Sequence, residues 1–168
     1  MCTLRSAVMA CAGMLSTAPA YADNACAPVL ALIDKLNATK EYRALSTYIE
    51  TKFQHPGTEE GIFFQWKYYF RWNGGPWTVQ RRVPNDHNVW DCQRHADEII
   101  DGIPTITMRY MREYRGDLLR LRTNISKLTG LPVRIRYSFL GPGIYDFWTT
   151  KFDYTGPFVD PVLRSQSE

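Results

Sequence analysis

The chain has 168 residues, with 20 Lys and Arg against 17 Asp and Glu, and a formal net charge of +3 at pH 7. This charge is small and the arginines are spread along the chain, so the sequence has no extended footprint for nucleic acid. A weak attraction to acidic partners or anionic lipid head groups stays open, and with it a peripheral membrane contact. Aromatic residues make up 14% of the chain, a share that favours sheets and concave apolar surfaces.

Residues 1–22 have the pattern of a secretory signal peptide. Arg5 supplies a positive start, a short apolar run extends from Ala7 to Leu15, and Ala20-Tyr21-Ala22 is a small-x-small cleavage site. The run is shorter than the ~20 residues that cross a bilayer. We therefore expect cleavage after Ala22, export to the periplasm, and one mature domain over residues 23–168.

Four cysteines divide between the two parts of the chain. Cys2 and Cys11 lie in the signal peptide, where Cys11 leaves a lipid anchor open as an alternative, and Cys26 and Cys92 lie in the mature chain. In an oxidising compartment a lone pair of cysteines is most simply a disulfide. The Cys26–Cys92 bond would tie the start of the first helix to the sheet, with a stabilisation of roughly 4 kcal/mol from the long loop it closes.

The first predicted element is a helix from about Cys26 to Arg43. Asp23 or Asn24 can cap it and Pro28 fits its first turn. Its apolar residues follow three-and-four spacing, which gives one apolar face: Val29, Leu30, Ile33, Leu36 and Tyr42. A strand over residues 47–54 and a turn over residues 55–61, rich in Pro and Gly, are expected next.

The most aromatic stretch, residues 62–72, is predicted to be one strand that ends in the hairpin turn Asn73-Gly74-Gly75. Alternation along a strand would place five rings on one face of the sheet: Phe64, Trp66, Tyr68, Phe70 and Trp72. Two interpretations stay open. The rings either pack under the helix, as large rings do in ordinary cores, or part of the row lines a ligand cavity.

Strands are then predicted over residues 77–83, 89–93, 97–100 and 103–114, followed by an antiparallel meander over 118–126, 131–140 and 144–154. The meander alternates between an apolar face and a face of arginines. The apolar face holds Leu119, Leu121, Ile125, Val133, Ile135, Tyr137 and Phe139. We therefore predict an α+β fold, in which a curved antiparallel sheet of eight or nine strands wraps an N-terminal helix, and a loosely held tail after Tyr154.

An early cysteine stands at a helix start, and a later cysteine precedes Glu98-Ile99-Ile100-Asp101-Gly102 and then Met108-Arg109-Tyr110. These are followed by the run from Asn124 to Arg134, which contains Gly130-Leu131-Pro132, and by Phe152-Asp153-Tyr154. In this order the segments resemble the LolA-like periplasmic proteins, the family of the lipoprotein carriers, and most closely their small uncharacterised relatives. The resemblance implies a half-open barrel with a helical plug and a hydrophobic concave face, which in the carriers binds acyl chains.

Catalytic motifs are missing from the sequence, which has no Gly-x-Ser-x-Gly, His-Glu-x-x-His or phosphate-binding glycine loop. Asp86, His87, Asp91 and His95 surround Cys92 and are residue types that bind divalent metals. Their spacing matches no recognised ligand pattern, so a solvated loop is the better interpretation. We predict a protein without enzymatic activity, catalytic residues, cofactor or metal.

The function expected from these observations is reversible binding of a lipid or other hydrophobic ligand on the concave face of the sheet. The predicted binding residues are Phe64, Trp66, Tyr68, Phe70, Leu119, Leu121, Val133, Ile135 and Tyr137. The alternative is a cell-envelope protein-interaction module whose core is filled by its own helix. Both fit an exported protein with an envelope partner or an acyl-chain ligand.

Overall fold

The structure is a computed structural model, and it describes residues 25–50, 55–114, 116–140 and 145–161. The predicted signal peptide, residues 1–22, lies outside the described residues. The described residues contain one helix, α2 (Ala27–Ala38), followed by nine strands. Their bounds are β1 (Tyr42–Glu50), β2 (His55–Phe63), β3 (Lys67–Trp72), β4 (Thr78–Arg81), β5 (Val89–Ile100), β6 (Ile103–Tyr114), β7 (Asp117–Ser126), β8 (Pro132–Phe139) and β9 (Tyr145–Asp153).

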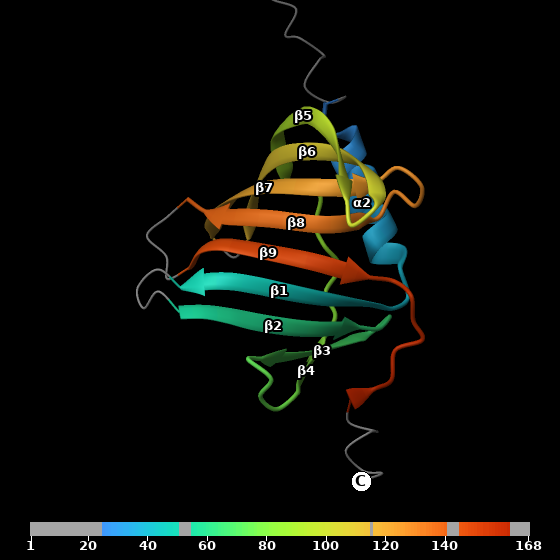
Figure 1. Ribbon diagram of the computed structural model, residues 1–168, viewed down its shortest axis with the longest axis vertical. Coiled ribbons are helices and arrows are strands. Elements are labelled where there is room, and N and C mark those ends of the chain that lie inside the picture. The colour runs from blue at the N-terminus through green and yellow to red at the C-terminus, as the bar shows by residue number, and fades with distance from the viewer. Residues whose placement is uncertain (1–24, 51–54, 115, 141–144, 162–168) are drawn as a thin grey trace, which may run out of the picture.

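The nine strands form one sheet in the order β4-β3-β2-β1-β9-β8-β7-β6-β5. Each neighbouring pair is antiparallel, and the first strand pairs with the last, Ser46 opposite Thr150. This pairing joins two meanders, β1–β4 and β5–β9, into a curved sheet with α2 behind it (Figure 1). Because β4 and β5 remain edges, the sheet is not closed, and the predicted α+β fold with an open curved sheet and an N-terminal helix is confirmed.

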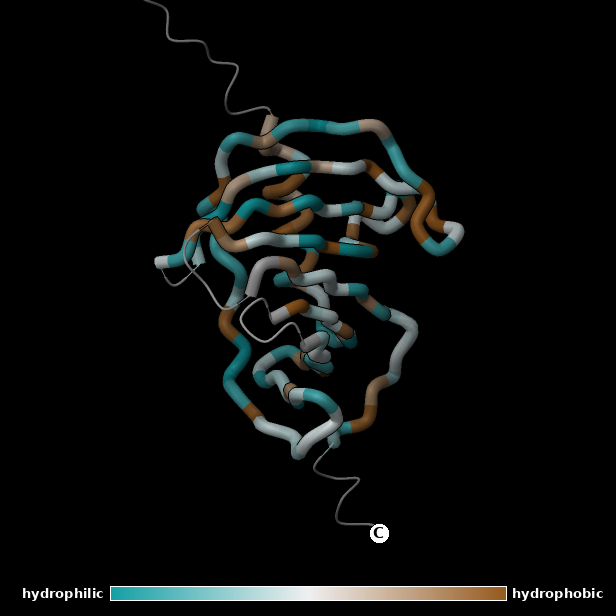
Figure 2. Tube along the Cα trace, turned by 60° about the vertical axis from the view of Figure 1, so that its left-hand side comes forward, coloured by the Kyte–Doolittle hydropathy of each residue, from teal (hydrophilic) through white to brown (hydrophobic). Residues whose placement is uncertain are grey.

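Side chains alternate between a concave and an outer face along the central strands. In β1 the concave face takes Tyr42, Ala44, Ser46 and Tyr48, which are buried, while the residues between them are exposed. In β7, buried Leu119 and Leu121 alternate with exposed Arg120 and Arg122, so hydrophobic and hydrophilic segments follow each other along that strand in the hydropathy colouring of Figure 2. A period of two is what a sheet covered on one face requires.

The helix packs against one half of the concave face. Val29, Leu32 and Ile33 form a buried cluster with Met108, Tyr110, Leu119, Leu121 and Ile125 of β6 and β7. Leu36, at the other end of the helix, packs with Tyr42 and Ala44 of β1. Three-and-four spacing thus gives α2 one apolar stripe, and the sheet covers it.

The helix is shorter than predicted, ending at Ala38 rather than near Arg43. Arg82, which follows β4, donates hydrogen bonds to the carbonyl oxygens of Leu36 and Thr39 at 2.7 and 2.8 Å and so occupies the helix end. Thr39 is extended, and the chain enters β1 with Tyr42 facing inward. Tyr42 roughly continues the three-and-four spacing of the apolar helix residues, and this is why the end of the helix was predicted too late in the sequence.

The segment predicted to be a turn, residues 55–61, is most of strand β2, and the predicted strand of residues 62–72 is interrupted. The amide of Phe64 bonds to the carbonyl of Lys67 at 2.8 Å, closing a tight turn there. Gly57 fits a strand because the ring of Tyr48 occupies the space a Cβ would need. Glycine at such a position allows a close approach rather than a turn.

Residues 89–100, predicted as two short strands, form one strand, β5, with register shifts between Trp90 and Gln93 and between His95 and Glu98. Cys92 of this strand is bonded to Cys26, as predicted, with their Cα atoms 5.1 Å apart. The bond ties the residue before α2 to the edge of the second meander. Among the described residues, no helix has the length and apolar character of a membrane span.

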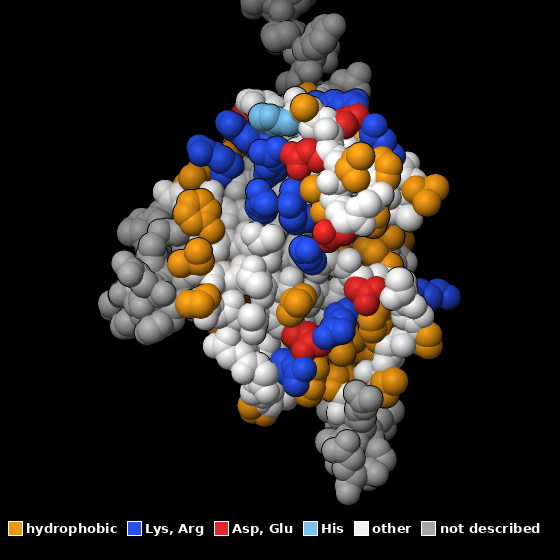
Figure 3. Space-filling view, in the orientation of Figure 1, with side chains coloured by type: hydrophobic (Ala, Val, Ile, Leu, Met, Phe, Trp, Pro, Cys, Tyr) orange, Lys and Arg blue, Asp and Glu red, His pale blue; other side chains and the backbone are white. Residues whose placement is uncertain are grey.

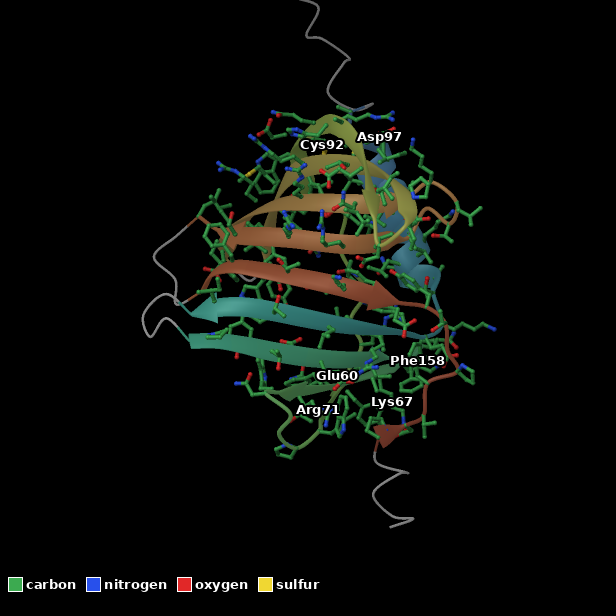
Figure 4. All side chains as sticks on the ribbon, in the orientation of Figure 1. Glu60, Lys67, Arg71, Cys92, Asp97 and Phe158 are labelled. Carbon is green, nitrogen blue, oxygen red and sulfur yellow. A yellow bond between two sulfur atoms is a disulfide. The ribbon has the colours of Figure 1, made fainter. Side chains whose placement is uncertain are left out.

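The segment after β9, predicted to be loosely held, is anchored as far as Asp160. Its carboxylate bonds to the Lys67 ammonium at 2.5 Å and accepts a hydrogen bond from the Tyr69 hydroxyl at 2.7 Å. Phe158 and Lys67 accordingly lie at the same end of the sheet (Figure 4). The sequence after Tyr154 therefore covers part of the outer face of β3.

Candidate ligand-binding face

The concave face has two halves, and α2 covers the half built by β6 and β7. Two of the predicted binding residues, Leu119 and Leu121, belong to the buried cluster under the helix. Ile135 and Tyr137 of β8 are partly buried against the same cluster, and Val133 is half-buried. In this half the helix itself occupies the apolar surface of the sheet.

The predicted aromatic row is split between two places. Phe64 and Trp66 lie in the turn between β2 and β3, where Trp66 is 75% exposed. Both line a shallow, open pocket of about 470 Å³ at the end of the sheet, together with Lys40, Glu41, Gln65 and Lys67. Tyr68 and Phe70 lie on β3 instead, half-buried, with ring centroids 5.2 Å apart. The structure therefore does not bring these four residues into one site.

The half of the concave face that lies beyond α2 is built from rings. Trp148 stacks on Tyr48 at 4.8 Å and on Tyr137 at 5.6 Å, and it meets Trp72 edge to face at 5.6 Å. These rings come from β1, β3, β8 and β9, strands that the curvature of the sheet brings to one surface. We call this surface the aromatic wall, made of Tyr48, Tyr68, Phe70, Trp72, Trp148 and Tyr137, the last of which also packs against the cluster under the helix.

Glu59 of β2 lies in the middle of the aromatic wall. It is directly opposite Ser46 of β1 on one side and Trp72 of β3 on the other. Ser46 is hydrogen-bonded to Thr150 at 2.9 Å, so these two hydroxyl groups are already paired. Glu59 is half-buried, and within the described residues it has neither a hydrogen bond nor an ion pair.

Burial raises the pKa of the Glu59 carboxyl above its ordinary value. Burial also raises the pKa of the Tyr137 hydroxyl, and the nearby charge of Glu59 adds to that rise. A half-buried carboxylate without a partner favours a hydrogen-bond donor or a cation beside it. Tyr48 and Trp148 of the aromatic wall are buried, whereas Trp72 is exposed and Tyr68 and Phe70 are half-buried. These last three rings can offer apolar contact and, to a cation, their faces.

The loop residues considered as metal ligands are dispersed. The His87 ring bonds to Asp34 of α2 at 2.7 Å, and Asp86 pairs with Arg112 at 3.3 Å. Cys92 is engaged in the disulfide. Among the described residues, no three His, Cys, Asp or Glu side chains group in a way that could hold a metal ion.

Glu59 and Arg82 were missed by the sequence analysis. Glu59 lies two residues from Gly57 and from Gly61, so in a strand all three share one face of the sheet. Two glycines beside a carboxylate leave that face uncrowded, and this pattern could have indicated the site if a strand had been predicted to include Pro56. Arg82 had no recognisable signal, because its partners are backbone carbonyl oxygens of distant residues, including Phe64 at 3.2 Å.

Comparisons with known proteins give a similarity in fold. Neither a protein-family model nor a curated protein matches the sequence. A crystal structure of MucB in complex with MucA(peri) is similar with a TM-score of 0.50 and 10% identity, covering 83% of this chain and 58% of that one. The structure of the Pseudomonas aeruginosa MucA/MucB complex is similar with a TM-score of 0.51 and 9% identity, covering 83% of this chain and 60% of that one.

The chain therefore spans about three fifths of the length of the MucB structures that it matches. A DUF1329 family protein from Desulfovibrio piger is more distant, with a TM-score of 0.33 and 11% identity. The match covers 83% of this chain and 96% of that one. No family model matches, so the resemblance to LolA-like proteins is without support from the sequence comparison. The structure comparison shows a weak similarity in fold to MucB.

Proposed function

We propose that this protein is a non-enzymatic binding module of the cell envelope that holds a segment of a partner protein against its aromatic wall. The observation that carries the proposal is Glu59, an unpaired, half-buried carboxyl among rings. A polypeptide segment supplies what this site lacks, since its amide N–H groups, or a Lys or Arg side chain, can bond to the carboxylate. Its apolar side chains can pack on the rings.

The fold comparison supports the same class of function. MucB, the protein similar in fold, is seen in those structures in complex with the protein MucA. The Cys26–Cys92 disulfide supports export, because such bonds persist in oxidising compartments. The signal-peptide pattern of residues 1–22 supports the same direction, so our proposal includes a periplasmic location, and cell fractionation of the expressed protein tests it.

A second candidate is a lipid or another hydrophobic ligand on the same wall. The observation that favours it is Trp72, a large apolar ring that is 40% exposed on the concave side. An acyl chain, however, would bury the Glu59 carboxylate without a donor, which is unfavourable. A ligand of this kind would need a polar or cationic head group at Glu59.

Site-specific photo-crosslinking in living cells separates the two candidates. A photoreactive benzoyl-phenylalanine replaces Trp72 on the aromatic wall or, as the matched control, Trp66 in the turn outside it. Our proposal expects a crosslinked protein at position 72, abolished by Glu59→Lys, and no such product at position 66. A lipid adduct at position 72, identified by mass spectrometry, would favour the second candidate. Equal labelling at both positions would contradict both.

A further inference from the structure

The outer face of the sheet carries a row of arginines in register across three strands. Arg109 of β6 is directly opposite Arg122 of β7, and Arg122 is directly opposite Arg136 of β8. Arg120 of β7 lies on the same face, one position further along. Figure 3 shows the Lys and Arg side chains gathered over β6–β8. Directly opposed like charges destabilise a sheet, so this arrangement is a cost to the isolated protein.

Acidic residues neutralise only part of this row. Glu98, from the end of β5 that bends over the outer face, pairs with Arg122 and with Arg134, the latter at 3.0 Å. Within the described residues, Arg109, Arg120 and Arg136 take part in no ion pair or hydrogen bond. Three guanidinium groups are thus available on one face. Guanidinium binds phosphate and carboxylate groups through two parallel hydrogen bonds.

Apolar side chains flank the arginine row on the same face. Trp90 of β5, 38% exposed, is opposite Met111 of β6, which is itself opposite Arg120. On the far side Phe147 of β9 is opposite Ile49 of β1, and they are 63% and 52% exposed. The outer face therefore combines cationic groups with exposed aromatic and aliphatic side chains.

We propose that this outer face docks on an anionic phospholipid surface. The arginines would bind lipid phosphates, and the Phe147–Ile49 pair would enter the boundary between head groups and acyl chains. Surfaces that bind membranes peripherally unite these features, since buried apolar area adds to attraction by anionic lipids. Aromatic side chains such as Trp90 favour the level of the head groups.

An acidic protein segment is the less suitable occupant. Strands β6–β9 each have a hydrogen-bonded neighbour on both sides, so their backbones offer no edge for an added strand. A peptide would therefore bind through side chains alone, to a broad face. The exposed Phe147 and Ile49 would add little to the recognition of an acidic segment, whereas a membrane uses both features.

Vesicle sedimentation tests the proposal on the disulfide-bonded mature chain, with phosphatidylcholine vesicles and with mixtures that contain phosphatidylglycerol. We expect binding only to the anionic vesicles, decreasing as salt is added. The variant Arg109→Gln/Arg136→Gln should bind roughly 25-fold more weakly, at about fivefold for each charge removed. The control Lys35→Gln/Lys40→Gln loses the same net charge from exposed positions in α2 and just after it, outside this face, and should bind as the native chain does.

Phe147→Ser separates membrane insertion from charge attraction. It should weaken binding to anionic vesicles and leave the salt dependence unchanged. Failure of the native chain to bind anionic vesicles, or equal losses in the two charge variants, would overturn the proposal. Binding of a poly-glutamate peptide with no vesicle binding would also overturn it, in favour of an acidic protein partner. The crosslinking result at Trp72 is independent of these outcomes because Trp72 lies on the opposite face.

Discussion

The ring of Tyr48 lies over Gly57 so closely that a Cβ at Gly57 would stand 2.0 Å from Tyr48 Cζ. The ring is only 8% exposed and packs against Trp72 and Trp148, so it is unable to swing aside freely. Gly57→Ala should therefore destabilise the protein by about 1–3 kcal/mol, the usual range for overpacking. Chemical denaturation measures this change, and Thr58→Ala on the exposed side of β2 serves as the control.

The same contact predicts a coupling between the two positions. In Tyr48→Val the space above Gly57 is vacated, so adding Gly57→Ala to this variant should cost much less than it does in the native chain. Full additivity of the two changes would show that the ring is not what requires glycine at this position.

Glu59→Gln should raise the stability of the protein at neutral pH. Burial raises the folded-state pKa of Glu59, so the folded form favours the protonated carboxyl. Stability from this group is therefore fully present below the unfolded-state pKa and is lost as pH rises through the folded-state pKa. The gain in Glu59→Gln should be a fraction of the ~1–3 kcal/mol that an unsatisfied buried polar group costs. Unfolding free energies at about pH 4 and about pH 7 measure it.

The neighbouring residue supplies a control of opposite sign. Glu60 points to the outer face and pairs with Arg43 and Arg71, each at 2.6 Å (Figure 4 labels Glu60 and Arg71). Glu60→Gln should lower stability at neutral pH by about 1 kcal/mol, because solvent weakens both pairs at the partly exposed arginines while the Glu60 side chain is only 12% exposed. If both variants shift stability in the same direction, the assignment of the two carboxyls to opposite environments is wrong.

Arg82 joins three parts of the structure that are distant in sequence. Its guanidinium donates to carbonyl oxygens of Leu36, Thr39 and Phe64 and lies 5.2 Å from the centre of the Tyr42 ring. Arg82→Gln should lower the free energy of unfolding by about 1.5–3 kcal/mol, the range for hydrogen bonds to a charged group. Arg81→Gln, an exposed neighbour, should stay within about 0.5 kcal/mol of the native value, and a comparable loss there would contradict a specific role for Arg82.

Removal of the disulfide should be the most damaging of these changes. Cys26→Ser/Cys92→Ser opens a loop with a sequence separation of 66 residues. The expected loss is about 2–5 kcal/mol, measured by thermal or denaturant unfolding. A reducing agent should destabilise the native chain by a similar amount and leave the double variant unchanged, which distinguishes the bond from the loss of thiol packing.

The fold was predictable where residue pattern and environment coincide. The alternation of Leu119 and Leu121 with arginines predicted the antiparallel strands at the end of the chain, and the two cysteines of the mature chain predicted the disulfide. Prediction failed where long-range contacts decide local structure. Pro56 and Gly57 indicate a turn by themselves, but the ring of Tyr48 makes glycine suitable for a strand. The turn at residues 64–66 contains neither Gly nor Pro and gave no local signal.

The candidate site shared this difficulty. An unbroken aromatic row from Phe64 to Trp72 was expected on one surface, but the turn sends Phe64 and Trp66 to the end of the sheet. Trp148 and Tyr48, which stack on each other in the aromatic wall, meet through the β1–β9 pairing. No local pattern reveals that two strands so far apart in the chain are neighbours.

The pairing of β1 with β9 also sets an order of events during synthesis. The chain emerges amino end first, so β1 can form its hairpin with β2 early but must wait for almost the entire remaining chain before its other edge is covered. Closing so long a loop slows folding. Until then an exposed strand edge is open to wrong partners, and the Cys26–Cys92 bond, which needs only the chain as far as β5, can form before the two meanders meet.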